Sequence, residues 1–302
     1  MSAPVFPATG ARGHYESYYL RAVDPHAPRG VWIRNTVLRR RGGAPAGSLW
    51  CTVWDGDGGP PVAVKETPGL AVAGDWLAIG SARFGPDAMK GSASAGGRSA
   101  SWDLTVSDAA PPLRHLPVYN APLPRTKLES PAPSARFSGT VEAGDRKLEL
   151  DGWPGMIGHN WGSQHAERWL WLHGIGFEGA PDAWLDVAVG RVRIGPFTTP
   201  WIANGALHRD GRRSPLRGPA EVDARPGEAT VSVGDTRIHV TALLEQTVAW
   251  VYADPPGGEH HSLNCSIAAL EVDGLATSHG GVYELGVRER DHGVRLAPFP
   301  DP

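Results

Sequence analysis

The sequence predicts an all-β protein built from two β-rich halves. Glycine (39 residues) and proline (28 residues) are abundant among the 302 residues. Because they are spread between short apolar runs, they indicate many turns and not disorder. These runs recur at even spacing, and helical periodicity is scarce throughout the chain. A Pro-rich stretch at 108–133 interrupts them, and such a stretch is not expected inside a sheet. The pattern therefore predicts two antiparallel sandwiches or barrels.

The first half contains six expected strands joined by turns rich in glycine and proline. The run Asp55-Gly-Asp-Gly-Gly59 is a strong hairpin signal between two of them. We place a first domain at residues 1–115, a Pro-rich crossing at 116–134 and a second domain at 135–302. The expected strands are 16–22, 31–39, 48–54, 61–66, 76–82 and 100–107.

The second half begins with an expected hairpin, 135–142 and 146–150, around the turn Ala143-Gly-Asp145. Strand 168–177 follows a glycine-rich segment and is the most aromatic strand of the chain. The later strands are expected at 183–189, 200–207, 220–224, 229–233, 236–244, 248–253, 262–272 and 281–287.

The segment 151–177 carries an unusual density of tryptophan, histidine and glycine. Its first part has glycines at 152, 155, 158 and 162, which predict a turn or a close backbone approach. In the strand after it, Trp169, Trp171 and His173 share one face, while the leucines between them face the other. Two apolar faces predict a strand buried on both sides. We expect this segment to border a ligand cavity, and the alternative is that it simply packs a corner of the sheet.

Charge and cysteine content exclude several classes of protein. The net charge of −3 and the pI near 6.5 argue against a nucleic-acid partner. Cys51 and Cys265 are far apart, so no disulfide framework or thiolate metal site is expected. With no signal-peptide pattern and no run of membrane-spanning length, we expect a soluble, cytoplasmic protein. The oligomeric state cannot be predicted from the sequence.

Cofactor motifs are also lacking in the sequence. It contains neither a Gly-x-Ser-x-Gly nucleophile elbow nor a Gly-x-Gly-x-x-Gly dinucleotide fingerprint. His159, His165 and His173 offer nitrogen ligands, but neither cysteine nor carboxylate completes a set with them. We therefore expect no metal and no other cofactor, and we interpret His260 and His261 as solvated loop residues.

Four segments together resemble one family. They are Glu16-Ser-Tyr-Tyr-Leu-Arg-Ala22, Gly30-Val-Trp-Ile-Arg34, Gly158-His-Asn-Trp-Gly162 with the following Trp169-Leu-Trp171, and Gly280-Gly-Val-Tyr-Glu284. They are similar to the double-lipocalin family of carotenoid hydratases (hydroxyneurosporene synthases), which is related to tocopherol cyclases and lipocalin-like Diels–Alderases. The resemblance implies two lipocalin-like (calycin) barrels packed together around an apolar ligand cavity. The chain is short for a carotenoid hydratase and lacks a recognisable acidic catalytic motif.

The resemblance implies cofactor-free chemistry on a terpenoid, polyene or polyketide-like molecule, by acid-assisted hydration or cyclisation. Such a reaction needs a buried, protonated acid and electron-rich walls that stabilise a developing cation. A non-catalytic carrier, or a purely structural pair of filled barrels, would share most of these features. For each candidate acid the alternative is a paired structural carboxylate. The candidate catalytic residues are His159, Asp186 and Glu284, with Glu66 as a further acid, and the candidate binding residues are Asn160, Trp161, Trp169, Trp171 and Trp250.

Overall fold

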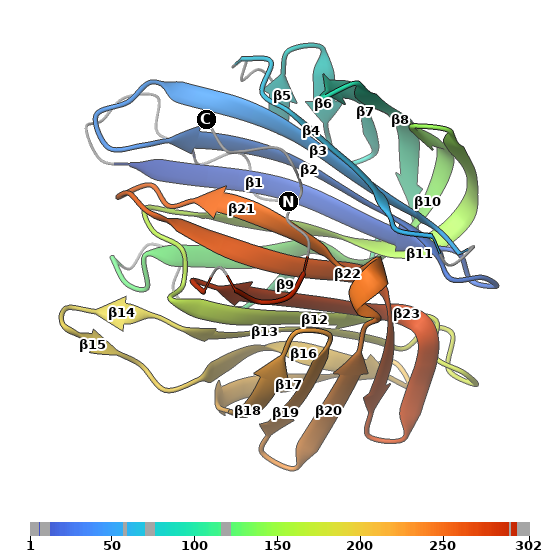
Figure 1. Ribbon diagram of the computed structural model, residues 1–302. Helices are drawn as coiled ribbons and strands as arrows, with labels where there is room; N and C mark the ends of the chain where they lie inside the picture. The colour runs from blue at the N-terminus through green and yellow to red at the C-terminus, as the bar shows by residue number, and fades with distance from the viewer. Residues whose placement is uncertain are drawn as a thin grey trace.

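The computed structural model describes residues 6, 13–56, 59–69, 76–115, 122–289 and 291–294. Two large curled antiparallel sheets form the molecule, one above the other in Figure 1. The helical content of the described residues is a single short 3-10 turn, η1 (Leu244–Gln246). The expected all-β class with two barrel-like halves is confirmed.

The first sheet pairs its strands in the order β4-β3-β2-β1-β11-β10-β8-β7-β6-β5, with β9 beside β10. It curls until β4 lies against β7, and it encloses a core that includes Trp76, Trp102 and Phe137. Its strands are β1 (His14–Val23), β2 (Arg29–Arg39), β3 (Pro45–Asp55), β4 (Val62–Glu66), β5 (Leu77–Ile79), β6 (Ala82–Phe84), β7 (Ala88–Ala95), β8 (Arg98–Ser107), β9 (Leu113–Arg114), β10 (Thr126–Ala143) and β11 (Arg146–Gly162).

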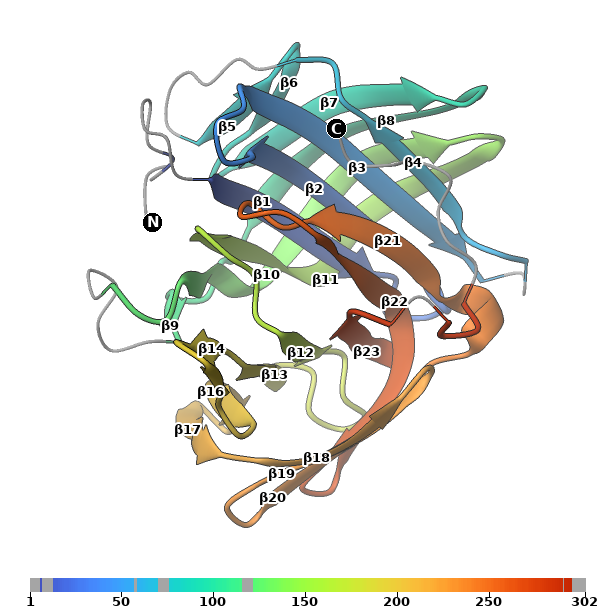
Figure 2. The ribbon, with the colours of Figure 1, turned by 60° about the vertical axis from the view of Figure 1, so that its left-hand side comes forward.

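The second sheet has the order β17-β16-β13-β12-β23-β22-β20-β19-β18, with β21 beside β22. It curls around a separate core, and Figure 2 shows this second sheet below the first. Its strands are β12 (Arg168–Gly174), β13 (Trp184–Arg191), β16 (Ile202–Arg209), β17 (Arg212–Pro219), β18 (Glu221–Arg225), β19 (Glu228–Val233), β20 (Thr236–Thr241), β21 (Val248–Ala253), β22 (Glu259–Val272) and β23 (Leu275–Val287). A small hairpin of β14 (Arg193–Ile194) and β15 (Phe197–Thr198) projects beside it.

The strands at the junction of the sheets are buried on both faces. In β12, Leu170 and Leu172 enter the core of the second sheet, while Trp171 packs against Tyr19 of β1. In β1, Leu20 enters the core of the first sheet. Because successive side chains of a strand point to opposite faces, each of these strands contributes to two packed regions. The two-sided burial expected for the aromatic strand is confirmed.

The change of sheet comes after Gly162 and not in the Pro-rich stretch. Both β10 and β11 pair with strands of the first sheet, so residues 135–162 belong with the N-terminal half. Pro131 and Pro133 lie inside β10, where the register with β11 shifts between Glu129 and Ala135. A bulged segment tolerates proline because its backbone N–H groups are not all used in the ladder.

The glycine-rich segment 152–162 is the second half of β11, so of the two expected roles for its glycines, a turn or a close approach, the structure shows the close approach. The glycines there serve close packing. A Cβ on Gly158 would lie 2.2 Å from the ring of Tyr19, and one on Gly155 would lie 2.1 Å from the carbonyl oxygen of Arg21. These glycines let β1 and its aromatic side chains pack tightly on β11.

Candidate functional site

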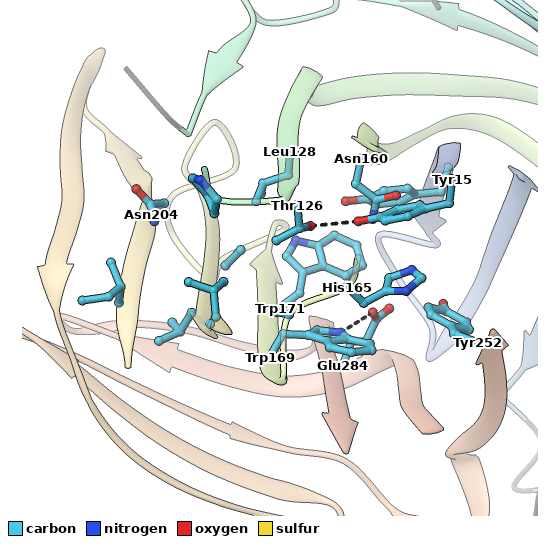
Figure 3. Close-up of a pocket in the computed structure, with 18 of the residues that line it drawn as sticks. Tyr15, Thr126, Leu128, Asn160, His165, Trp169, Trp171, Asn204, Tyr252 and Glu284 are labelled. Carbon is cyan, nitrogen blue, oxygen red and sulfur yellow. Dashed lines mark hydrogen bonds between the residues drawn. The ribbon is translucent and has the colours of Figure 1, made fainter. Parts of the chain in front are cut away.

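A cavity of about 440 Å³ lies where the two sheets meet. One wall comes from β1, β2, β10 and β11, and the other from β12, β13, β16, β21 and β23 (Figure 3). Aromatic and aliphatic side chains dominate both walls, and a few polar groups interrupt them. The main lining residues are Tyr15, Tyr19, Trp32, Arg34, Leu123, Thr126, Leu128, Asn160, His165, Trp169, Trp171, Val189, Ile194, Ile202, Asn204, Tyr252 and Glu284.

Two indoles of β12 form the centre of the second wall, and each donates its N–H to a carboxylate. Trp169 Nε1 lies 3.0 Å from Glu284 Oε1, and Trp171 Nε1 lies 3.0 Å from Asp186 Oδ1 (the first pair is drawn in Figure 3). A carboxylate at the N–H edge draws the proton and makes the ring more electron-rich. These indoles therefore suit a ligand that carries or develops positive charge near their faces.

Glu284 is the carboxylate that reaches the cavity itself. It stands on β23, is 7% exposed, and accepts one hydrogen bond on each oxygen. Asn264 Nδ2 donates to its second oxygen at 3.0 Å. With a donor on each oxygen, the carboxylate is held as an acceptor and in one orientation.

Asp186 lies behind the wall and does not line the cavity. It accepts hydrogen bonds from Trp171 and from Ser130 Oγ, and His115 Nε2 lies 3.5 Å from Oδ2. Burial raises the pKa of Asp186, but the hydrogen bond and charge of His115 outweigh it, and the pKa falls to about 2. An ionised carboxylate held this way fits the structural alternative better than the protonated acid expected from the sequence.

Arg34 is the buried cation of the cavity. Its guanidinium lies 4.4 Å from the ring centre of Tyr252 and donates to Ser17 Oγ at 2.8 Å and to Thr36 Oγ1 at 2.9 Å. Among the described residues no carboxylate lies within ion-pair distance of it. A cation that is 4% exposed, and whose partners among the described residues are hydroxyl groups and aromatic rings, is well suited to bind an anionic or strongly polar ligand group.

Polar groups of the first wall complete the lining. Tyr15 donates to or accepts from Thr126 Oγ1 at 2.8 Å and stacks on His165 at 4.0 Å between ring centres. Burial raises the pKa of Tyr15 to about 12, so this phenol stays neutral. The side-chain oxygen of Asn160, on β11, is buried and accepts no hydrogen bond from any described residue.

His159 faces away from the cavity. Adjacent residues of a strand point to opposite faces, so Asn160 lines the cavity while His159 enters the core of the first sheet. There Nε2 lies 2.8 Å from Glu16 Oε1 and Nδ1 lies 3.3 Å from Glu129 Oε1. Its ring is stacked with Tyr18 and Trp161.

Of the other predicted residues, Trp169, Trp171 and Glu284 line the cavity with Asn160, while Trp161 and Trp250 do not. Trp250 packs with Trp32 and Trp50 in an aromatic cluster between the sheets. Glu66, at the end of β4, accepts the backbone N–H of Ser94.

Most lining residues were not predicted as site residues, and Tyr15, Tyr19, Arg34 and Tyr252 are the aromatic and charged examples that matter most for binding. Arg34 had a usable signal, because a charge in the middle of the apolar run 31–38 must be paired or face a polar site. The tyrosines had no signal that distinguishes them from core residues.

The three histidines of segment 151–177 that offered nitrogen ligands for a metal lie in different parts of the structure. His159 lies in the first core, and His173 lies against Arg21 between the sheets, with Nδ1 3.4 Å from Arg21 Nη1. His165 lies with Asp254 and His260, and its Nδ1 is 3.2 Å from Asp254 Oδ1. His260 and His261 are both buried at the start of β22, so the expectation that they are solvated loop residues was wrong.

Comparison with known proteins finds relatives without a described activity. No family model matches the chain. Uncharacterized proteins from two strains of Mycobacterium tuberculosis, CDC 1551 / Oshkosh and H37Rv, are each 27% identical over 308 residues, covering 96% of this chain and 89% of the relative. The similarity spans both sheets, but the names of these relatives indicate no function. Among the described residues, no helix is long and apolar enough to cross a membrane.

Proposed function

We propose that the protein binds a hydrophobic small molecule, of terpenoid, polyene or polyketide type, in the cavity between its sheets. The observation that carries this proposal is the cavity of about 440 Å³, with aromatic walls and a few converging polar groups. Small-molecule sites have this size and this mixture of many apolar and few polar groups.

Exposed apolar side chains at the edge of the cavity favour an apolar ligand. Leu123 and Ile194 line the cavity and are also 42% and 44% exposed. Phe197, on the same small hairpin as Ile194, is 75% exposed. Large apolar side chains at an opening favour the entry of apolar molecules and disfavour polar metabolites.

The polar lining suggests a ligand with one polar end. Arg34 and Asn160 both line the cavity from the first sheet, and the buried side-chain oxygen of Asn160 accepts no hydrogen bond from any described residue. A carboxylate, enolate or phenolate would satisfy Arg34, and a hydroxyl would satisfy Asn160. The apolar remainder would lie along Trp169, Trp171 and Leu128.

Catalysis is a second candidate function, and the carboxylate-bonded indoles favour it over a simple carrier. Acid-assisted hydration or cyclisation passes through a cation, and the faces of Trp169 and Trp171 would stabilise that cation. Glu284 is the lining carboxyl group: in its protonated form it could give the proton that generates the cation, and the carboxylate left behind could take a proton back from the cationic intermediate or from the water that adds to it. A carrier would bind the same ligand without converting it.

Binding can be tested with cis-parinaric acid, a polyene carboxylate whose fluorescence rises in apolar sites. The proposal predicts saturable binding of about one molecule per chain, and weaker binding of its methyl ester, which cannot pair with Arg34. Gly190→Leu is the matched variant. Gly190 lines the cavity and an added Cβ meets nothing closer than 3.8 Å, so a larger side chain would fill the cavity without a clash at its Cβ. Binding of equal strength in Gly190→Leu would refute the proposed site.

Catalysis needs a separate test. Terpenoid and polyene candidates are incubated with the wild type and with Glu284→Gln, and the products are followed by mass spectrometry. Conversion by the wild type that falls in Glu284→Gln, with binding retained, supports an enzyme. Binding without conversion in either protein supports a carrier.

A further inference from the structure

We propose that His165, Asp254 and His260 form a binding site for a divalent transition-metal ion such as Zn²⁺. Their potential ligand atoms all lie within 4.8 Å of one another. Two imidazoles and one carboxylate are a donor set that zinc and ferrous iron both accept. This inference does not rest on the proposed small-molecule function, although His165 also lines the cavity.

The fold brings these residues together from distant parts of the sequence. His165 lies in the segment that links β11 to β12, at the change of sheet. Asp254 follows β21, and His260 is the second residue of β22, so both lie on one hairpin whose turn is closed by the Asp254 N–H to the Gly258 carbonyl. One hairpin thus presents two of the three ligands.

The separations suit direct coordination. His165 Nδ1 and Asp254 Oδ1 are 3.2 Å apart. Atoms bound tetrahedrally to zinc at about 2.0–2.2 Å lie roughly 3.3–3.6 Å from each other. With all three atoms inside 4.8 Å, an ion needs only small side-chain adjustments to reach each of them.

His260 provides the second, independent observation. It is 0% exposed, and neither of its ring nitrogens makes a hydrogen bond with any described residue. A buried imidazole without a hydrogen-bond partner is costly, and a metal ion would satisfy one of its nitrogens.

The surrounding charges allow a cation to bind. Asp254 is 1% exposed, and its carboxylate supplies the negative charge. Arg288 lies 3.6 Å from Asp254 Oδ2, but it also pairs with Glu167 at 3.1 Å, which offsets its charge. The oxygen Oδ1 faces His165 and also accepts the His165 backbone N–H at 2.8 Å, which orients the carboxylate.

The test is metal binding by the full-length protein, freed of any polyhistidine tag and treated with a chelator. Zn²⁺ is titrated by calorimetry, and bound metal is counted by elemental analysis after gel filtration. Co²⁺ serves as a second probe because its visible absorption reports nitrogen and oxygen coordination. The wild type should bind one equivalent of Zn²⁺, and its thermal midpoint should rise on binding.

Three variants and one control assign the site. His260→Gln, Asp254→Asn and His165→Gln should each weaken Zn²⁺ binding by about tenfold or more, since each removes a direct ligand. His239→Gln is the control, because His239 lies on β20 with threonine partners and should leave binding unchanged. A wild type that binds no stoichiometric zinc overturns the proposal, whatever the variants do. Zinc binding of equal strength in all three variants overturns it as well.

Discussion

A buried contact between the sheets should make stability depend on pH between pH 6.5 and 4. Arg21 of β1 reaches into the second sheet, where its guanidinium donates to the carbonyls of Gly280 at 3.1 Å and Ser266 at 2.5 Å. It also faces Nδ1 of His173 at 3.4 Å, while Nε2 of His173 donates to the Pro133 carbonyl at 3.0 Å. His173 must therefore be neutral, with Nδ1 as an acceptor.

The pKa of His173 sets the size of the pH effect on the free energy of unfolding. Burial, followed by the charge of Arg21, lowers the pKa of His173 from 6.5 to about 4. As the pH falls below 6.5, His173 binds a proton in the unfolded chain but stays neutral in the folded protein. The free energy of unfolding therefore decreases. The full difference corresponds to about 3 kcal/mol, of which about 2 kcal/mol is lost by pH 5.

Urea unfolding at pH 7.5 and pH 5.0 measures this loss. His173→Gln is the matched variant, because its amide can accept from Arg21 and donate to Pro133 but does not titrate. The wild type should lose about 2 kcal/mol more than His173→Gln between the two pH values. Equal losses in the two proteins would show that His173 takes up its proton in the folded state as readily as in the unfolded chain, and would refute this reasoning.

Three further predictions concern packing and chemistry. Gly158→Ala should lower the free energy of unfolding by about 1–3 kcal/mol, because its Cβ would lie 2.2 Å from the Tyr19 ring. Gly190→Ala is the control: its Cβ would meet nothing closer than 3.8 Å, and the variant should stay within about 0.5 kcal/mol of the wild type. Trp171→Phe should cost about 1–3 kcal/mol beyond its lost packing, since one oxygen of the buried Asp186 loses its donor, and a denaturation midpoint equal to that of the wild type would contradict this. Burial raises the pKa of both cysteine thiols to about 12, so a disulfide-exchange reagent should label neither in the native protein and both in urea; rapid native labelling would be inconsistent with their burial.

Alternation of residue types along short segments predicted most strands, but it could not predict which strands pair when they are far apart in the sequence. The hairpin 135–150 and the two faces of β12 follow from patterns a few residues long. The change of sheet after Gly162 depends on pairing between β11 and β1, about which local pattern says nothing. Strands β7 and β17 were missed because small and polar residues dominate them, as expected for strands with one exposed face.

The same contrast between local patterns and long-range contacts applies to the residues of the cavity and the metal-ligand cluster. Trp169 and Trp171 reach the cavity because residues two apart in a strand share a face, which the sequence shows directly. His159 and Asn160 were predicted together, although neighbours in a strand point in opposite directions. Asp254 could not be connected with His165, since 89 residues separate them and only the folded sheets bring them together.

The most direct measurement of the central claim is a crystal structure of the protein with cis-parinaric acid bound. The account predicts the polyene chain between the two sheets, against Trp169, Trp171 and Leu128, with its carboxylate at Arg34. Density for the polyene inside the core of either curled sheet, or only on the outer surface, would contradict it.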